Sequence, residues 1–136
     1  MQWLPSFALG IDEIDQQHQQ LLHHAAAVVE AIQQQKSWSD IYYQIEALRQ
    51  FVSFHFQFEE ALMRMFRFPD MDGHAQSHES FFLKLEEIEL QAIHDNLEKN
   101  VVQLLTDWFT GHILHSDRSY VEHLRQLPGI TLSSAR

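Results

Sequence analysis

The sequence predicts an all-α protein, an antiparallel up-down-up-down four-helix bundle, and three observations support this. Glycine and proline are scarce, with four and three residues among 136. Turn signals occur at only four places, residues 36–40, 68–73, 94–96 and 127–129. The segments between them have lengths of roughly 20–30 residues and carry apolar residues at alternating spacings of three and four, as helices with one buried face do.

Length and composition indicate one domain over residues 1–136, with an N-terminal arm at 1–11 and a loose C-terminal tail at 128–136. The net charge of −10 argues against nucleic acid or an anionic membrane as a partner. Cysteine is absent, so disulfides and sulfur-bound metals are excluded. Because the chain has neither a signal-like start nor a long apolar run, we expect a soluble, cytoplasmic protein without membrane insertion.

The first two segments each place histidine on the apolar face. In the first segment that face holds Ile14, His18, Leu21, Leu22 and Ala25. In the second it holds Ile41, Ile45, Leu48, Val52, His55, Glu59, Leu62 and Phe66. A buried polar group without a partner costs roughly 1–3 kcal/mol, so these polar positions require compensation.

The third and fourth segments repeat this feature. The third has His74, His78, Phe81, Leu85, Ile88 and Ala92 on one face. The fourth has Val101, Leu105, Trp108 and His112, after which the stripe continues, displaced by one residue, as Ile113, Asp117, Tyr120, Leu124 and Leu127. A one-residue skip is typical of a π-bulge. We therefore expect the helix to loosen near residues 112–116, which would turn both His112 and Asp117 inward.

Counted from the predicted turns, the inward polar residues of all four helices lie at about the same height in the bundle. They are His18, His55, Glu59, His74, His78, His112 and Asp117. Five imidazoles and two carboxylates pack poorly but suit iron, zinc, copper or nickel, and carboxylates can bridge two ions. With two octahedral ions and one oxide or hydroxide bridge, a single coordination position stays open. Satisfied core histidines are the plain alternative for any one of them, but not for five at one height.

Two other metal patterns fit less well. No glutamate is followed by histidine three residues later, the spacing that ferritin-like di-iron bundles use. The HExxH motif of zinc proteases is also absent.

Four blocks together resemble the signature of the hemerythrin family in its bacterial single-domain form. They are GIDEIDQQHQQL (10–21), FVSFHFQFEEALM (51–63), HAQSH (74–78) and WFTGHILHSDRSY (108–120). The resemblance covers Trp3 to about Leu127. It implies a four-helix bundle with a non-heme di-iron site in its core that binds O₂ reversibly.

The resemblance also implies a role for each inward polar residue. His74, His78 and His112 would hold one iron, His18 and His55 the other, and Glu59 and Asp117 would bridge them. O₂ would bind end-on at the iron of His18 and His55 and become a hydroperoxide while both irons are oxidised from ferrous to ferric. The implied role is oxygen storage, delivery or sensing, with an oxygen-consuming acceptor as a possible partner. A di-iron oxidase, peroxidase or nitric-oxide-processing enzyme, and a sensor or iron-handling module, are the alternatives.

Several further residues carry less specific expectations. His115 could compete as a ligand but is expected to face solvent, as are His23, His24, His94 and His123. Glu60 should face outward or support a ligand, and Asp15 could orient a ligand or favour the start of its helix. A dry wall around the site could be formed by Leu22, Phe51, Leu62, Phe81 and Trp108, which are equally explained as plain core.

Overall fold

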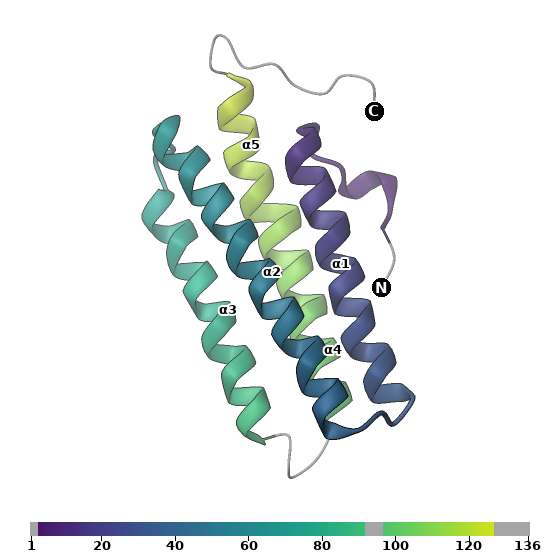
Figure 1. The fold of residues 1–136 in the computed structure, drawn as a ribbon. Coiled ribbons are helices and arrows are strands. Elements are labelled where there is room, and N and C mark those ends of the chain that lie inside the picture. The colour runs from purple at the N-terminus through teal and green to yellow at the C-terminus, as the bar shows by residue number, and fades with distance from the viewer. Residues whose placement is uncertain (1–2, 92–96, 127–136) are drawn as a thin grey trace.

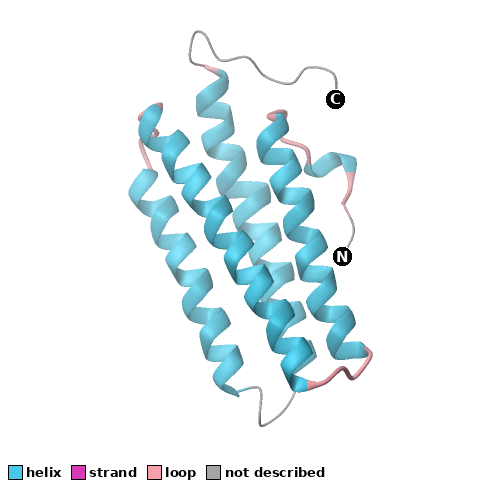
Figure 2. Cartoon of the chain, in the orientation of Figure 1, coloured by secondary structure: helices cyan, strands magenta, loops and turns pink. Residues whose placement is uncertain are grey.

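The computed structural model describes residues 3–91 and 97–126, without the side chains of residues 91, 97–98 and 113–116. The described residues form helices joined by short connections and include no strand (Figures 1 and 2). The long helices are α1 (Asp12–Gln33), α2 (Trp38–Met65) and α3 (Met71–Gln91). The fourth rod of the bundle is continuous but has three parts: α4 (Leu97–Trp108), the π-helical segment η2 (Phe109–Asp117) and α5 (Arg118–Arg125). A short 3₁₀ turn, η1 (Pro5–Phe7), precedes α1.

The rods run antiparallel and surround one core (Figure 1). α1 packs against α2 and α4, α2 packs against α3, and α3 packs against α4. This closed ring is the predicted up-down-up-down bundle, and the all-α prediction is confirmed. No helix in the described part of the chain is long and apolar enough to cross a membrane.

Two of the four predicted turns fall between described helices. Ser37 caps α2 by accepting a hydrogen bond from the Asp40 backbone N–H at 3.2 Å, and Gln35 adopts a positive φ of 53° in the same turn. α3 begins at Met71, inside the second predicted turn. The predictions for residues 94–96 and 127–129, and for the tail at 128–136, lie outside the described residues.

The apolar stripes are buried largely as expected, with corrections in α3 and α2. Ile88 of α3 is half-buried, while Ala92, Leu127 and the side chain of Ile113 lie outside what the structure describes. In α2, Leu62 and Phe66 are only half-buried, whereas Phe56 and Met63 are fully buried. A strict seven-residue repeat drifts by about 20° per heptad on a straight α-helix, so over 28 residues the buried face moves to later positions.

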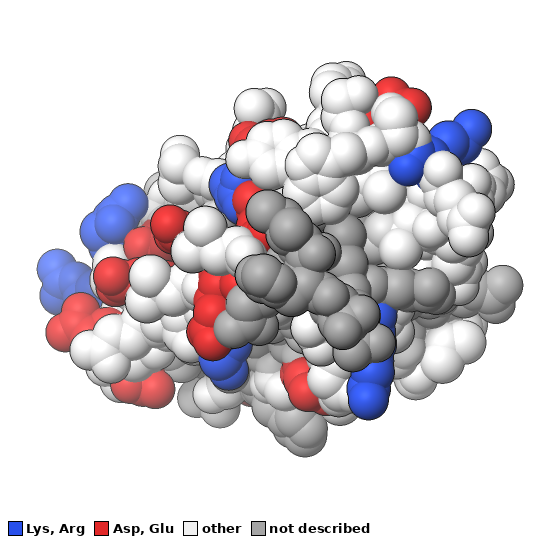
Figure 3. Space-filling view, turned by 90° about the horizontal axis from the view of Figure 1, so that it is seen from below, with Lys and Arg blue, Asp and Glu red and all other residues white. Residues whose placement is uncertain are grey.

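The core is divided into two apolar clusters. The layer between them, called the polar slab below, consists of His18, His55, Glu59, His74, His78, His112 and Asp117. The larger cluster fills the half of the bundle towards the α1–α2 turn and includes Leu21, Leu48, Phe81 and Trp108. The smaller lies towards the other end and includes Ile14, Met63, Tyr120 and Leu124. The space-filling view of the lower end of the bundle shows acidic and basic side chains interspersed (Figure 3).

Candidate metal centre

All seven inward polar residues predicted from the sequence meet in the slab between the two apolar clusters. Their relative exposures range from 0% to 5%, so the group is as buried as the apolar core. Each of the four rods contributes, because His18 comes from α1, His55 and Glu59 from α2, His74 and His78 from α3, and His112 and Asp117 from the fourth rod.

The fourth rod delivers both of its polar residues because its helix is π-helical there. η2 spans Phe109–Asp117, so the prediction of a loosened helix near 112–116 is confirmed, and the segment is longer than expected. Five residues correspond to about 140° beyond a full turn in an α-helix, which would have directed His112 and Asp117 to different faces. The wider i→i+5 turn brings them to one face, and both are buried.

The seven side chains form two groups that share their carboxylates. One group consists of Glu59, His74, His78, His112 and Asp117, and the other of His18, His55, Glu59 and Asp117. Within each group one ligand atom from every residue lies within 4.8 Å of the others. The site therefore has two positions at which an ion could be held, and Glu59 and Asp117 belong to both.

Each carboxylate directs one oxygen towards each group. Asp117 Oδ1 lies 2.9 Å from His74 Nε2 and 3.2 Å from His112 Nε2, while its Oδ2 lies 3.0 Å from His18 Nε2. Glu59 Oε2 lies 3.0 Å from His74 Nε2, and its Oε1 contacts His55 Nε2. This is the disposition that a carboxylate needs in order to bridge two ions.

Three of the histidines have their outer ring nitrogen engaged by a neighbour. His55 Nδ1 bonds to Gln17 Oε1 at 2.7 Å, and His78 Nδ1 bonds to Glu60 Oε2 at 3.0 Å. His112 Nδ1 lies 3.0 Å from Ser77 Oγ, whose own hydrogen is donated to the His74 backbone carbonyl. Because each partner oxygen must accept, each of these Nδ1 atoms carries the proton, and each Nε2 presents a lone pair to the interior.

The interior lone pairs face each other without a hydrogen between them. His78 Nε2 and His112 Nε2 are 3.0 Å apart, and both must act as acceptors. Among the described residues, His55 Nε2, Glu59 Oε1 and Asp117 Oδ1 are also buried without a well-formed hydrogen bond. Converging acceptors in a dry core repel one another unless cations lie between them, so the donor set fits two metal ions.

Burial and mutual contact shift the pKa values in this pocket in opposite directions. Burial, with the nearby His112 and His74, lowers the pKa of His78 to about 2, and burial also lowers the pKa values of His18 and His112. Burial alone would lower the pKa of His74, but its hydrogen bonds to Asp117 and Glu59 raise that pKa to about 9.

The two carboxylates also differ. Burial and the adjacent Asp117 raise the pKa of Glu59 well above its usual range. Burial would raise the pKa of Asp117 as well, but His112, His18 and His55 around it hold that pKa well below its usual range. Most of the histidines are therefore neutral at pH 7, which is the form that binds metal.

Aromatic rings form the wall of the site on the side of the larger apolar cluster. Phe56 stacks on His78 with ring centroids 3.7 Å apart and an interplanar angle of 3°. Trp108 stacks on His112 at 5.2 Å and 8°. Of the predicted wall residues, Leu22, Phe81 and Trp108 are buried, whereas Phe51 and Leu62 are half-buried.

Two acidic residues near the cluster, Glu60 and Asp15, form specific hydrogen bonds. Glu60 supports His78 rather than facing freely outward. Asp15 has a role outside both expectations, because its carboxylate accepts the Leu9 and Gly10 backbone N–H groups at 2.7 and 3.1 Å and so holds the N-terminal arm.

The remaining histidines differ in their environments. His23 is exposed as expected, whereas His24 is half-buried against Phe51 and His123 bonds to the Phe66 carbonyl oxygen at 3.0 Å. The predictions for His94 and for the His115 side chain lie outside what the structure describes.

Sequence reasoning missed Gln17, Ser77 and Phe56. Gln17 and Ser77 are polar residues next to His18 and His78, but each bonds to a histidine on another helix, 38 and 35 residues away. The drift of the buried face along α2 is the signal that could have identified Phe56.

The fold and this site together define a helical bundle built around a buried cation-binding core. Residues 9–124 match the family model described as the hemerythrin HHE cation binding domain, and the chain belongs to the hemerythrin family.

Curated relatives agree with this assignment. The chain is 29% identical to a bacteriohemerythrin of Clostridium acetobutylicum, over 88% of this chain and 98% of the relative. It is 31% identical to a bacteriohemerythrin of Pseudomonas paraeruginosa, over 90% and 80% of the two chains. A hemerythrin-like protein of Naegleria gruberi is 28% identical, over 87% and 88%.

Proposed function

We propose that the protein binds O₂ reversibly at a non-heme di-iron centre, for oxygen storage, delivery or sensing, and that it is not primarily an enzyme. In this proposal His74, His78 and His112 hold one iron, His18 and His55 hold the other, and Glu59 and Asp117 bridge the two. The partners are then O₂ and, in a delivery role, an oxygen-consuming acceptor protein.

The observation that carries the proposal is the two-sided arrangement of the carboxylates among facing imidazole lone pairs. Counting one atom from each histidine and each carboxylate, the groups offer five and four donors. The position beside His18 and His55 therefore has more coordination sites to spare for a small ligand. When bound, two ferrous ions supply the electrons that O₂ binding requires.

The surroundings favour a small neutral ligand over a larger substrate. His18 and His55 are fully buried, and among the described side chains the nearest aromatic ring to His18 besides His55 is Phe109, at 6.5 Å between centroids. Apolar walls exclude water and charged molecules from such a site. The donor set is rich in neutral imidazole, so highly oxidised iron gains little stabilisation, and this supports carriage over oxidation chemistry.

Anaerobic reconstitution with ferrous iron tests the proposal. We expect two irons per chain and a visible band that appears in air and disappears under argon through repeated cycles. Consumption of O₂ over many turnovers with added reductant, or a band that does not reverse, would instead favour a di-iron oxidase or peroxidase.

Substitutions test the ligand set in the same assay. His78→Ala and Glu59→Ala should each abolish stoichiometric iron loading, because each removes a donor that no neighbour replaces. His123→Ala is the matched control, since it removes a histidine outside the cluster and should leave two irons bound. Full loading of the Glu59→Ala protein would contradict the assignment of a bridging carboxylate.

A further inference from the structure

A groove of about 570 Å³ lies between α3 and α4, next to the cluster but outside it. Its apolar floor is formed by Phe81, Leu104 and Trp108, with the half-buried Ile88 towards one end. A volume of this size is typical of small-molecule sites, which combine an apolar surface with a few polar groups. None of the seven cluster residues lines this groove, but it adjoins the cluster because Trp108 stacks on His112 and Ser77, which also lines it, bonds to His112.

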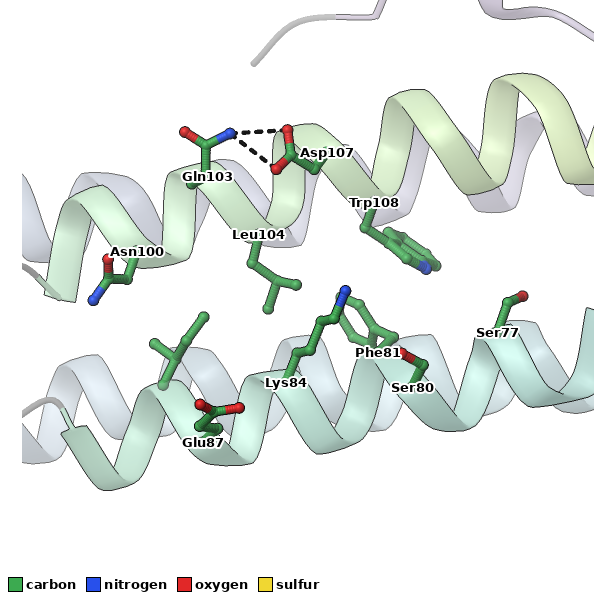
Figure 4. A pocket seen from close by; sticks show the side chains of 11 residues that line it. Ser77, Ser80, Phe81, Lys84, Glu87, Asn100, Gln103, Leu104, Asp107 and Trp108 are labelled. Carbon is green, nitrogen blue, oxygen red and sulfur yellow. Dashed lines mark hydrogen bonds between the residues drawn. The ribbon is translucent and has the colours of Figure 1, made fainter.

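Lys84 places a cation in the groove. Its side chain extends from α3 into the gap towards α4, with its ammonium group over the apolar floor (Figure 4). Among the described residues, no carboxylate lies within ion-pair distance of that ammonium. An unpaired cation beside apolar surface favours a ligand that carries an anionic group.

The acidic residues of the groove, Asp107 and Glu87, do not form an ion pair with Lys84. Both Asp107 carboxylate oxygens accept from Gln103 Nε2 at 2.9 Å, and this pair lies along the outer edge of α4 (Figure 4). Glu87 is exposed at the α3 edge, towards the end of the groove away from Trp108 (Figure 4). The anionic group of a ligand would therefore lie on the Trp108 side of Lys84.

Trp108 supplies a second donor at that side. Its side chain is 8% exposed, and its Nε1–H is buried without a hydrogen-bond partner among the described residues. Figure 4 shows the indole extending from α4 into the gap, with its nitrogen on the side that faces α3. A buried donor without an acceptor is costly, so an acceptor that reached it after a small side-chain shift would recover that cost.

We propose that this groove binds a small organic acid with an apolar body. The carboxylate pairs with the Lys84 ammonium and accepts from Trp108 Nε1–H after a small shift of the indole, while the apolar body covers Phe81 and Leu104. This site needs no metal, so it stands or falls separately from the di-iron proposal.

The experiment titrates 3-phenylpropionate into the ¹⁵N-labelled full chain and follows the indole N–H signals of its three tryptophans. We expect a saturable shift of the Trp108 signal, assigned with Trp108→Phe, while Trp3 and Trp38 stay unchanged. The alcohol and amine of the same carbon skeleton should bind at least tenfold more weakly, because they lack the anionic group. Equal shifts at all three indoles, or equal affinity for acid, alcohol and amine, would overturn the proposal.

Variants locate the site. Lys84→Ala should weaken binding of 3-phenylpropionate at least tenfold, whereas Lys99→Ala, which removes an exposed lysine outside the groove, should leave it unchanged. Ser80→Phe places a ring in the groove from an exposed α3 position and should also abolish binding. Lys84, Lys99 and Ser80 are all exposed, so these substitutions should preserve folding, which the remaining amide signals check. Unchanged affinity in Lys84→Ala would refute the proposed ion pair.

Discussion

At the scale of single residues, the side chains of the metal-free cluster have pKa values shifted in opposite directions. The native state keeps His18, His78 and His112 neutral because burial lowers their pKa values. It keeps a proton on His74, whose pKa is raised to about 9, and it raises the pKa of Glu59 through burial and the adjacent Asp117. The stability of the metal-free protein must therefore depend on pH on both sides of pH 6.5.

We predict that the metal-free protein is most stable near pH 6.5. Below that value, His18, His78 and His112 take up protons on unfolding that their buried positions exclude, whereas Glu59, with its raised pKa, acts in the opposite direction. Because three histidines act against one carboxylate, stability should fall as pH decreases. Above pH 6.5 the contribution of His74 is lost as pH rises towards 9. Urea unfolding at pH 5.5, 6.5 and 8.5 measures this, and a stability that increases steadily to pH 8.5 would contradict it.

A second residue-scale prediction concerns Glu60, which does not reach the interior but accepts from His78 Nδ1. Glu60→Ala should weaken iron binding about 10- to 100-fold, because such partners orient a ligating imidazole and raise its basicity. Chelator competition measures the affinity. The neighbouring Glu79→Ala is the matched control, because Glu79 is exposed and no bond of its side chain to the cluster is found. Equal affinities in the two variants would remove the proposed role of Glu60.

The limit of sequence reasoning is also clearest at this scale. All seven cluster residues could be identified because each interrupts an apolar stripe at a matching height. Gln17 and Ser77 could not, because each acts across a helix pair, and which side chains meet there depends on how the two helices are rotated. Asp15 likewise bonds to Leu9 and Gly10 in an arm whose conformation carries no periodic signal.

At the scale of elements, the π-helical segment is what places Asp117 in the site. The one-residue skip between His112 and Asp117 was readable because apolar residues continue on both sides of it. Its extent back to Phe109 was not, since nothing in the apolar pattern distinguishes a short bulge from two π-helical turns. The drift along α2 has the same origin, because the pattern gives the average face of a helix and not its exact rotation.

Inserting one alanine within 113–116 should turn Asp117 away from the cluster, because Asp117 would then follow His112 by six residues, about 240° beyond a full turn in an α-helix. Both ion positions share Asp117, so we expect binding of fewer than two irons while the helical circular dichroism is retained. Deleting one neighbouring residue from the lengthened segment restores the original length and should restore loading. Two tightly bound irons in the lengthened protein would mean that Asp117 is not required as a bridge.

At the scale of the whole molecule, the polar slab separates two apolar clusters that would otherwise form one continuous core. Without metal, the slab contributes facing acceptors and unsatisfied carboxylate oxygens in place of apolar contacts. The bundle has apolar packing on both sides of the slab, so we expect it to fold without metal but with reduced stability.

Metal loading should therefore stabilise the entire bundle as one unit. A ligand at 100 times its dissociation constant adds about 2.7 kcal/mol, so two ions held at that level add roughly 5 kcal/mol. At this chain length that should raise the melting temperature by about 15 °C or more. Scanning calorimetry of loaded and metal-free protein measures the difference, with His123→Ala expected to keep the full shift and Glu59→Ala to lose most of it.

Both apolar clusters should melt in one transition in the loaded protein, because the ions would join all four rods at the level between the clusters. Two separate transitions in the loaded state would show that the slab does not couple the halves of the bundle.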